Sequence, residues 1–261
     1  MAQVRAKELR MKPVLAQWTG SDEVQVRGLA APVEVRRHPA ARRLSLRISR
    51  TRRAVIVTMP PRCRREEATA FLEDHLDWVR ERLAGLPAPI PFDDGAVFPL
   101  RGDLHQVHFT GTCRRASGHG VVRAVAPANE GALPLLEVYG QSEHRPRRLR
   151  DWLVSQAKLD LDERVTWHAR NLGVRPKRIT VRDQTTRWGS CSSSGALSFS
   201  WRLILAPPLV LDYVAAHEVA HLEEMNHGPR FWQLVELTMP RLEEAKHWLC
   251  HEGLDLHRYG A

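Results

Sequence analysis

Cysteine is scarce in this chain, and the few cysteines lie far apart. Cys63, Cys113, Cys191 and Cys250 form no Cys-x-x-Cys pair, so the sequence contains no thiol motif typical of zinc or redox sites. The phosphate-binding pattern G-x-x-x-x-G-K-[ST] is also missing. No motif therefore indicates a zinc–thiolate module, a dithiol redox enzyme or a P-loop nucleotide site.

Long apolar runs are absent as well. No segment approaches the ~18 apolar residues that a membrane-spanning helix needs. The first residues, MAQVRAKELRMKPVLAQW, have no continuous apolar core of the kind found in secretory signals. Hydrophobic residues make up 43% and charged residues 26% of the chain, as is typical of globular proteins. We expect a cytoplasmic protein with free thiols and no membrane partner.

Negative charge is in short supply in the first part of the chain. The net charge is +9, and residues 1–150 carry 26 Lys and Arg against 16 Asp and Glu, whereas residues 151–261 carry 13 against 14. The excess is concentrated between Arg36 and Arg65. This segment could bind nucleic acid or another polyanion. It contains no aromatic residue, which favours the simpler interpretation of a solvated basic face.

Alternating apolar and polar residues predict strands in the first half. The segments VEVRRH, RLSLRIS and AVIVTMP have the period of two that half-buried strands show. One amphipathic helix is predicted in REEATAFLEDHLDWVRERLAGL, followed by short strands in AVFPLRG, QVHFTG, GVVRAV and LLEVYG. We interpret residues 1–32 as a loosely ordered N-terminal extension and residues 33–141 as a β-rich region.

Helical patterns dominate residues 142–261. A long helix is predicted from Ser142 to Asn171, and Gly173 lies just past its end. The strand RITVRD and a hairpin in RWGSCSSSGALSFSWRL come before a helix predicted over PPLVLDYVAAHEVAHLEE, which a proline pair opens. Two more helical segments are PRFWQLVELTM and RLEEAKHWLCHEGL. The predicted fold class is α+β, a β-rich region followed by a domain over residues 142–261.

Three histidines and a glutamate lie close together in the stretch HEVAHLEEMNHGPRFW. His217 and His221 are four residues apart, so they share one helix face, where two imidazoles can bind one metal ion. Glu218 lies about a quarter turn away and can reach a metal-bound water. This H-E-x-x-H arrangement supplies two ligands and a general base. Catalytic zinc needs a third protein ligand, and His227, beside a predicted turn, is the best candidate.

A chance arrangement is the alternative, because the chain has 13 histidines. His247 and His251 repeat the spacing without a glutamate, and we interpret them as ordinary surface or packing residues. Glu218 in its place, a third histidine at a turn and apolar flanking residues distinguish the first cluster. We therefore expect one Zn²⁺ per chain, since imidazoles in this arrangement favour zinc.

The segments RWGSCSSSGALSFSWRLILAP and LDYVAAHEVAHLEEMNHGPRFW resemble the YgjP-like metallopeptidases, which are zincins related to the SprT and WLM zinc-peptidase groups. RRLSLRIS, AVIVTMP and the helix ending in DWVRERL occur in the same order in that family, so the resemblance covers roughly residues 33–250. It implies a zincin-like catalytic domain after the β-rich region. It also implies His217, His221 and His227 as metal ligands and Glu218 as the catalytic base.

The resemblance gives the hairpin a role as well. In zincins, a strand beside the active-site helix binds the substrate peptide through its backbone, and the hairpin that begins at RWGSC would supply this edge. Arg187, Trp188 and Tyr213 are the candidate substrate-binding residues. Cys191 remains an alternative nucleophile. Glu224 stands where the related metzincins have glycine, so we expect the chain to turn later than in those enzymes.

Together these patterns favour a zinc-dependent metallopeptidase that cleaves peptide bonds by Glu218-assisted attack of zinc-bound water. One alternative is a metal-dependent nucleotide phosphohydrolase that uses the same site and holds phosphates with arginines. A second alternative is a nucleic-acid-associated protein with a structural zinc. A structural site would need four protein ligands, and the sequence offers three.

Elemental analysis of the purified protein tests the metal site. About one zinc per chain is expected in the wild type and much less in His227→Ala, because catalytic zinc depends on three protein ligands. If the wild type held no metal after zinc was added back and the excess removed, the metal site would be refuted and the hydrolase hypothesis with it.

Overall fold

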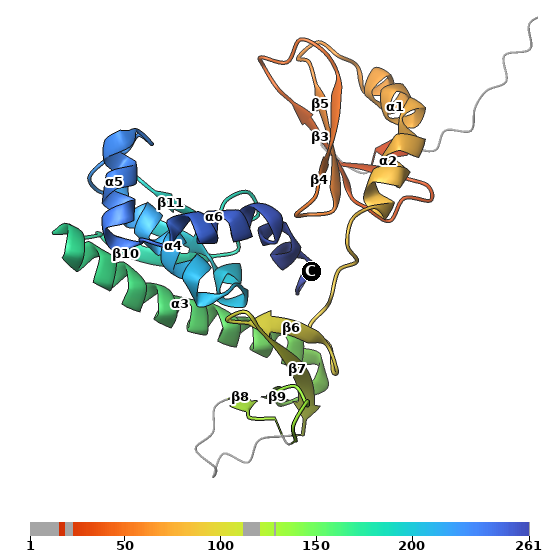
Figure 1. The fold of residues 1–261 in the computed structure, drawn as a ribbon. Helices are drawn as coiled ribbons and strands as arrows, with labels where there is room; N and C mark the ends of the chain where they lie inside the picture. The colour runs from red at the N-terminus through yellow and green to blue at the C-terminus, as the bar shows by residue number, and fades with distance from the viewer. Residues whose placement is uncertain (1–15, 19–22, 112–120, 128, 261) are drawn as a thin grey trace, which may run out of the picture. The chain divides into compact units, whose positions relative to one another are not determined.

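The computed structural model describes residues 16–18, 23–111, 121–127 and 129–260. Contacts between residues divide the chain between Leu86 and Pro87 into two compact units (Figure 1). Within the described residues, no helix is long and apolar enough to cross a membrane.

A five-stranded sheet with two helices on one face forms the first unit (Figure 1). The strand order is β1-β2-β3-β5-β4, with bounds Ala16–Trp18, Glu23–Val26, Val33–Arg37, Ala54–Met59 and Ser45–Ser49. β3 and β5 are parallel, and the other neighbours are antiparallel. Alternate valines of β3 and β5 face helices α1 (Arg65–Asp74) and α2 (Leu76–Ala84), and this contact forms the core.

Three strands expected from the alternation after residue 32 are confirmed as β3, β4 and β5. The single predicted helix is two helices, because the chain is interrupted at His75. β1 and β2 lie in the segment interpreted as a loosely ordered extension, although residues 1–15 of it lie outside the described residues. Strands of three and four residues are too short to show a period, and β2 owes its place to pairing with β3.

Two smaller sheets belong to the second unit. The first has the order β6-β7-β9-β8, with bounds Val97–Leu100, Asp103–Thr110, Leu135–Tyr139 and Val122–Val125. The second has the order β10-β12-β11, with bounds Arg178–Arg182, Ala196–Ser200 and Gly189–Cys191. β11 and β12 form the predicted hairpin, and β11 lies at an edge of this sheet.

The long helix α3 (Arg145–Leu172) serves two cores of the second unit. Its buried residues near the N-terminus pack with the β6–β9 sheet, and those near the C-terminus pack with the hairpin sheet and α4. The helix ends at Gly173, whose φ of 68° is left-handed, so the glycine beyond the predicted helix end serves as its cap. The remaining elements are α4 (Pro208–Ala220), α5 (Pro229–Thr238), α6 (Leu242–His251) and the 3₁₀ segments η2 (Ser142–His144), η3 (Trp201–Leu205) and η4 (Gly253–Arg258).

The predicted fold class, α+β with sheets first and helices later, is confirmed. The division into units differs from the boundaries expected at residues 32 and 141. The β6–β9 sheet buries Phe98, Val107 and Leu136 against Leu149 and Leu153 of α3, so it packs with the elements that follow it. The periodicity of a sequence predicts strands but does not show which element a sheet packs against. The boundary between the two units depends on that packing.

One half-buried carboxylate, that of Asp212, fixes α4 against α3. Asp212 accepts hydrogen bonds from Arg164 at 2.5 and 3.0 Å and from Nε2 of His168 at 2.8 Å. Burial raises the pKa of Asp212, but the hydrogen bonds from His168 and Arg164 outweigh it and hold the pKa below its usual value. The ionised carboxylate therefore stabilises the packing of the two helices.

Asp212→Asn is expected to lower the free energy of unfolding by about 1.5–3 kcal/mol near neutral pH, because charged hydrogen bonds to a half-buried carboxylate are lost. A lowered folded-state pKa gives stability that is present above the unfolded pKa of about 3.9 and is lost as pH falls through the folded value. The wild type and the variant should therefore converge in acid. Urea unfolding at several pH values measures this.

Glu244→Gln serves as the control, since the Arg241–Glu244 pair is exposed on both sides. It should change stability much less than Asp212→Asn. Equal losses in the two variants at neutral pH would refute the role of Asp212.

Candidate active site

Helix α4 is buried on nearly every side, which holds its polar residues in fixed surroundings. Val210, Val214, Val219 and their neighbours fill the core on both sides of the helix. Glu218 is only 5% exposed and His221 9% exposed. Polar groups are costly to bury without partners, so their presence in this helix calls for a chemical explanation.

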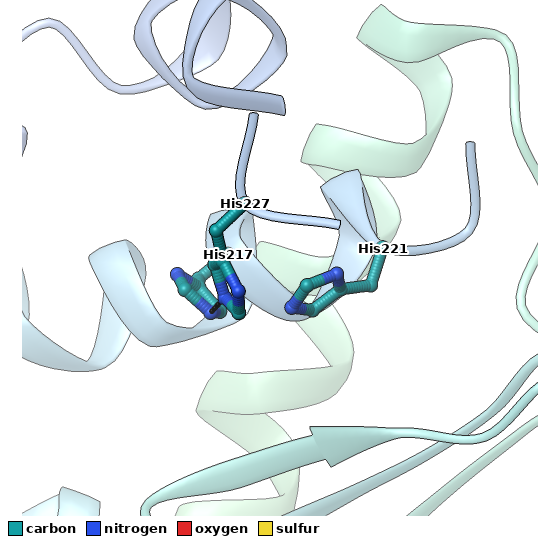
Figure 2. Close-up of side chains that lie close together, drawn as sticks. All are labelled: His217, His221 and His227. Atoms are coloured by element: carbon teal, nitrogen blue, oxygen red, sulfur yellow. Dashed lines mark hydrogen bonds between the residues drawn. The ribbon is translucent and has the colours of Figure 1, made fainter. Parts of the chain in front are cut away.

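The three histidines of the sequence motif meet at the end of α4 (Figure 2). The Nε2 atoms of His217 and His227 are 3.1 Å apart, and one ligand atom from each of the three rings lies within 4.8 Å of the others. Two nitrogens bound to zinc at ~2.0–2.1 Å in a tetrahedral arrangement are about 3.3 Å apart. The donor set therefore fits one divalent ion held by imidazoles.

In His217 and His221 the Nδ1 atom has another contact, so Nε2 of each ring is available to bind a metal ion. Nδ1 of His221 lies 3.0 Å from the carbonyl of Glu224 and donates to it, which fixes the tautomer. Nδ1 of His217 lies 3.5 Å from the hydroxyl of Tyr213. The hydrogen bond at His221 also closes a turn directly after Ala220, where α4 ends. The expectation of a helix reaching Glu224 with a later turn is therefore wrong.

Aromatic rings surround the histidines. The fully buried ring of Phe231, on α5, lies 4.9, 4.5 and 4.7 Å from the ring centroids of His217, His221 and His227. Burial, with further contributions from His221, His227 and a lysine, lowers the pKa of His217 to about 4. Burial also lowers the pKa of His221. Both rings are thus neutral at pH 7, as metal ligands must be.

Glu218 lies beside the histidines in a dry environment. Burial raises its pKa to about 7, and the positive charge of Arg187 opposes this shift. Its carboxylate lies against the backbone of Gly189 on β11, where an added Cβ would be 2.5 Å from Oε1. The glycine of the RWGSC segment is therefore required by the close approach of the glutamate.

The candidate substrate-binding residues lie in three different settings. Arg187 is exposed and close enough to Glu218 to influence its pKa. The hydroxyl of Tyr213 faces Nδ1 of His217, whereas Nε2 of the same ring faces His227. Trp188 is half-buried and packs against His257 at 5.0 Å between ring centroids. The structure thus brings Arg187 close to Glu218 and Tyr213 to Nδ1 of His217, whereas Trp188 packs against His257.

A hollow of about 550 Å³ covers the outer face of the hairpin sheet and is lined by Arg178, Arg182, Arg187 and Cys191 among others. None of the three arginines forms a salt bridge with another residue in the described parts of the chain. Burial, and then the charge of Glu218, raise the pKa of Cys191 to about 11. A protonated thiol is a poor nucleophile, so the structure disfavours Cys191 as the attacking group.

Sequence reasoning missed two residues of this site, Phe231 and Gly189. Phe231 follows the third histidine in HGPRFW, and Gly189 lies inside RWGSC. Both were in segments already singled out, but their roles depend on contacts between α4, α5 and β11. In the part of the chain that the structure describes, the metal-ligating group consists of the three histidines and includes no fourth histidine, cysteine or carboxylate, so it has fewer ligands than a closed structural zinc site.

Comparison with known protein families shows to which family the chain belongs. The model of the YgjP-like metallopeptidase domain matches residues 42–252, which is most of the chain. This chain belongs to the YgjP-like metallopeptidases. The family assigns the YgjP-like chain to the peptidase hydrolases that use a divalent metal and act on peptide or protein substrates. The suspected family is confirmed.

Other comparisons add little to the YgjP-like assignment. The crystal structure of the metallopeptidase zymogen of Pyrococcus abyssi abylysin matches with 19% sequence identity and a TM-score of 0.33, covering 36% of this chain and 95% of that one. No curated protein matches the chain.

Gly189→Ala in the YgjP-like chain is expected to reduce kcat/KM by about 100-fold, because the new methyl group must displace the Glu218 side chain by about 1 Å. Metal content should stay at the wild-type level, since the three atoms nearest to the new Cβ all belong to Glu218 and none belongs to a histidine. Gly111→Ala is the matched control, because a Cβ there meets nothing within 4 Å. Full activity in Gly189→Ala would contradict the placement of Glu218.

Proposed function

We propose that this protein is a zinc-dependent peptidase, with His217, His221 and His227 as the metal ligands and Glu218 as the general base. The observation that carries the proposal is the meeting of three imidazoles beside a buried carboxylate whose pKa is about 7. A base with a pKa near the operating pH is best suited to accept and return a proton. Neutral imidazoles favour zinc among the divalent ions, as in other sites of this composition.

The chain's own residues carry the proton transfers. A divalent ion held by the three imidazoles would act as a Lewis acid and make a water acidic enough to lose its proton near neutral pH. Glu218 accepts that proton as the peptide carbonyl is attacked and then delivers it to the leaving amine. The apolar wall that includes Phe231 excludes bulk water, which strengthens each electrostatic interaction at the site.

The substrate peptide would bind along β11. This strand lies at the edge of its sheet and directly beside α4, so its outer N–H and C=O groups are available for an added strand. Arg187 would hold a carbonyl or an acidic side chain near Glu218. We assign Tyr213 to the orientation of His217 and Trp188 to packing at the base of the hairpin.

Glu218→Gln tests the proposal. Hydrolysis of a mixed peptide library should fall about 10²–10⁴-fold, since the amide cannot accept a proton, while bound zinc stays near the wild-type level. Glu223→Gln, an exposed glutamate of the turn after α4, is the matched control and should retain full activity. Unchanged hydrolysis in Glu218→Gln would refute the assigned role.

Nucleotide phosphohydrolysis is the second candidate function, because Arg178, Arg182 and Arg187 line one hollow beside Glu218. Guanidinium groups bind phosphates in a bidentate manner. Phosphate release from nucleoside triphosphates, lost in His221→Ala, would support this function. Peptide cleavage with no phosphate release would decide for the peptidase.

A further inference from the structure

Several arginines of the first unit have no acidic partner among the residues that the structure describes. Residues 23–86 contain 14 arginines against 8 Asp and Glu. Arg42, Arg43, Arg47 and Arg50, in β4 and the segments that flank it, are exposed and form no ion pair with any residue that the structure describes. Arginines that support a fold usually have partners, as Arg52 does with Glu34 at 2.5 Å.

The fold brings an aromatic ring to these arginines. A hollow of about 830 Å³ lies between β4 and α2. Arg47 and Arg50 line it from the strand side, and Trp78 and Arg82 line it from the helix. Trp78 is 39% exposed, and the guanidinium carbon of Arg82 lies 5.8 Å from its ring centroid. The basic segment itself has no aromatic residue, so only the packing of α2 beside β4 completes this combination.

We propose that the hollow between β4 and α2 binds single-stranded nucleic acid, with a base stacked on Trp78 and phosphates held by Arg47 and Arg50. Exposed aromatic rings beside exposed arginines form the sites that such strands use, because every base has a face to stack and every phosphate has a charge to neutralise. The hollow has the size of a small-molecule site, which is ample for an unstacked base. Glu81 also lines it and disfavours a second phosphate at that position.

A single strand fits this surface better than a duplex. In a duplex each base is stacked on both faces, so its ring is not accessible to an indole. A polyanion without bases would engage the arginines but would gain nothing from Trp78. The proposal therefore predicts a preference that depends on bases, and this preference separates it from a merely basic surface.

Fluorescence anisotropy with the full chain and labelled oligothymidylate of about 20 nucleotides tests the proposal. The comparison strand is an abasic oligonucleotide of the same length, which keeps the phosphates and lacks the bases. Trp78→Ala should weaken binding of the thymidylate strand by about 5- to 150-fold and leave the abasic strand unaffected. Trp78→Phe should restore part of the loss, since a phenyl ring also stacks.

The salt dependence of the binding affinity tests the role of the two arginines. Arg50→Ser should reduce the slope of log K against log salt by about 0.7, the value for one phosphate contact on a single strand. Arg47→Ser should do the same. Two matched controls lie in the second unit. Trp167 is 43% exposed with an arginine over its ring, and Arg175 is exposed. Trp167→Ala and Arg175→Ser should leave the affinity and the slope unchanged.

Three results would overturn the proposal. One is no binding of oligothymidylate at low salt. Another is equal affinity for the thymidylate and abasic strands, which would reveal a polyanion surface only. The third is an unchanged affinity in a folded Trp78→Ala variant, with folding checked by circular dichroism. The test makes no use of peptide or nucleotide hydrolysis, so its outcome is independent of the catalytic proposal.

Discussion

The second unit depends on three imidazole rings meeting at one point. Two of these rings come from α4, and the third returns from the turn before α5. The chain can return there because α4 ends at Ala220, and the carbonyl of Glu224 accepts a hydrogen bond from His221. That bond closes the turn and selects the tautomer at once. A longer helix would carry His227 away from the other two rings.

Contacts with elements distant in the sequence set the positions of these side chains. Asp212, five residues before His217, ties α4 to Arg164 and His168 of α3. β11 passes so close to Glu218 that a Cβ at position 189 would force the glutamate side chain to move. Phe231 of α5 packs its ring against all three histidines. The reactive side chains are therefore held by three elements that are far apart in the sequence, which is what a preorganised site requires.

Local spacing was enough to find the histidines, the glutamate and the hairpin, because these signals lie within one helix turn or one pair of strands. The glycine cap of α3 was also visible. The predicted end of α4 was too late. The helix ends at Ala220, where a hydrogen bond from the His221 side chain to the carbonyl of Glu224 closes the turn. The contact of Gly189 with Glu218, and the hollow that Trp78 shares with Arg47 and Arg50, join segments tens of residues apart. No period or propensity in a single sequence encodes such contacts.

α3 has 28 residues and is thus about 42 Å long. Leu149, Leu153 and Ala157 belong to one core, and Leu161 and Val165 belong to the other. Neither core can lose its packing without exposing half of the same helix, and an isolated half would be too short to hold its backbone hydrogen bonds in water. We therefore expect the β6–β9 sheet and the histidine site to open together, so that the slowest amide exchange in α3 reports on the unfolding of both.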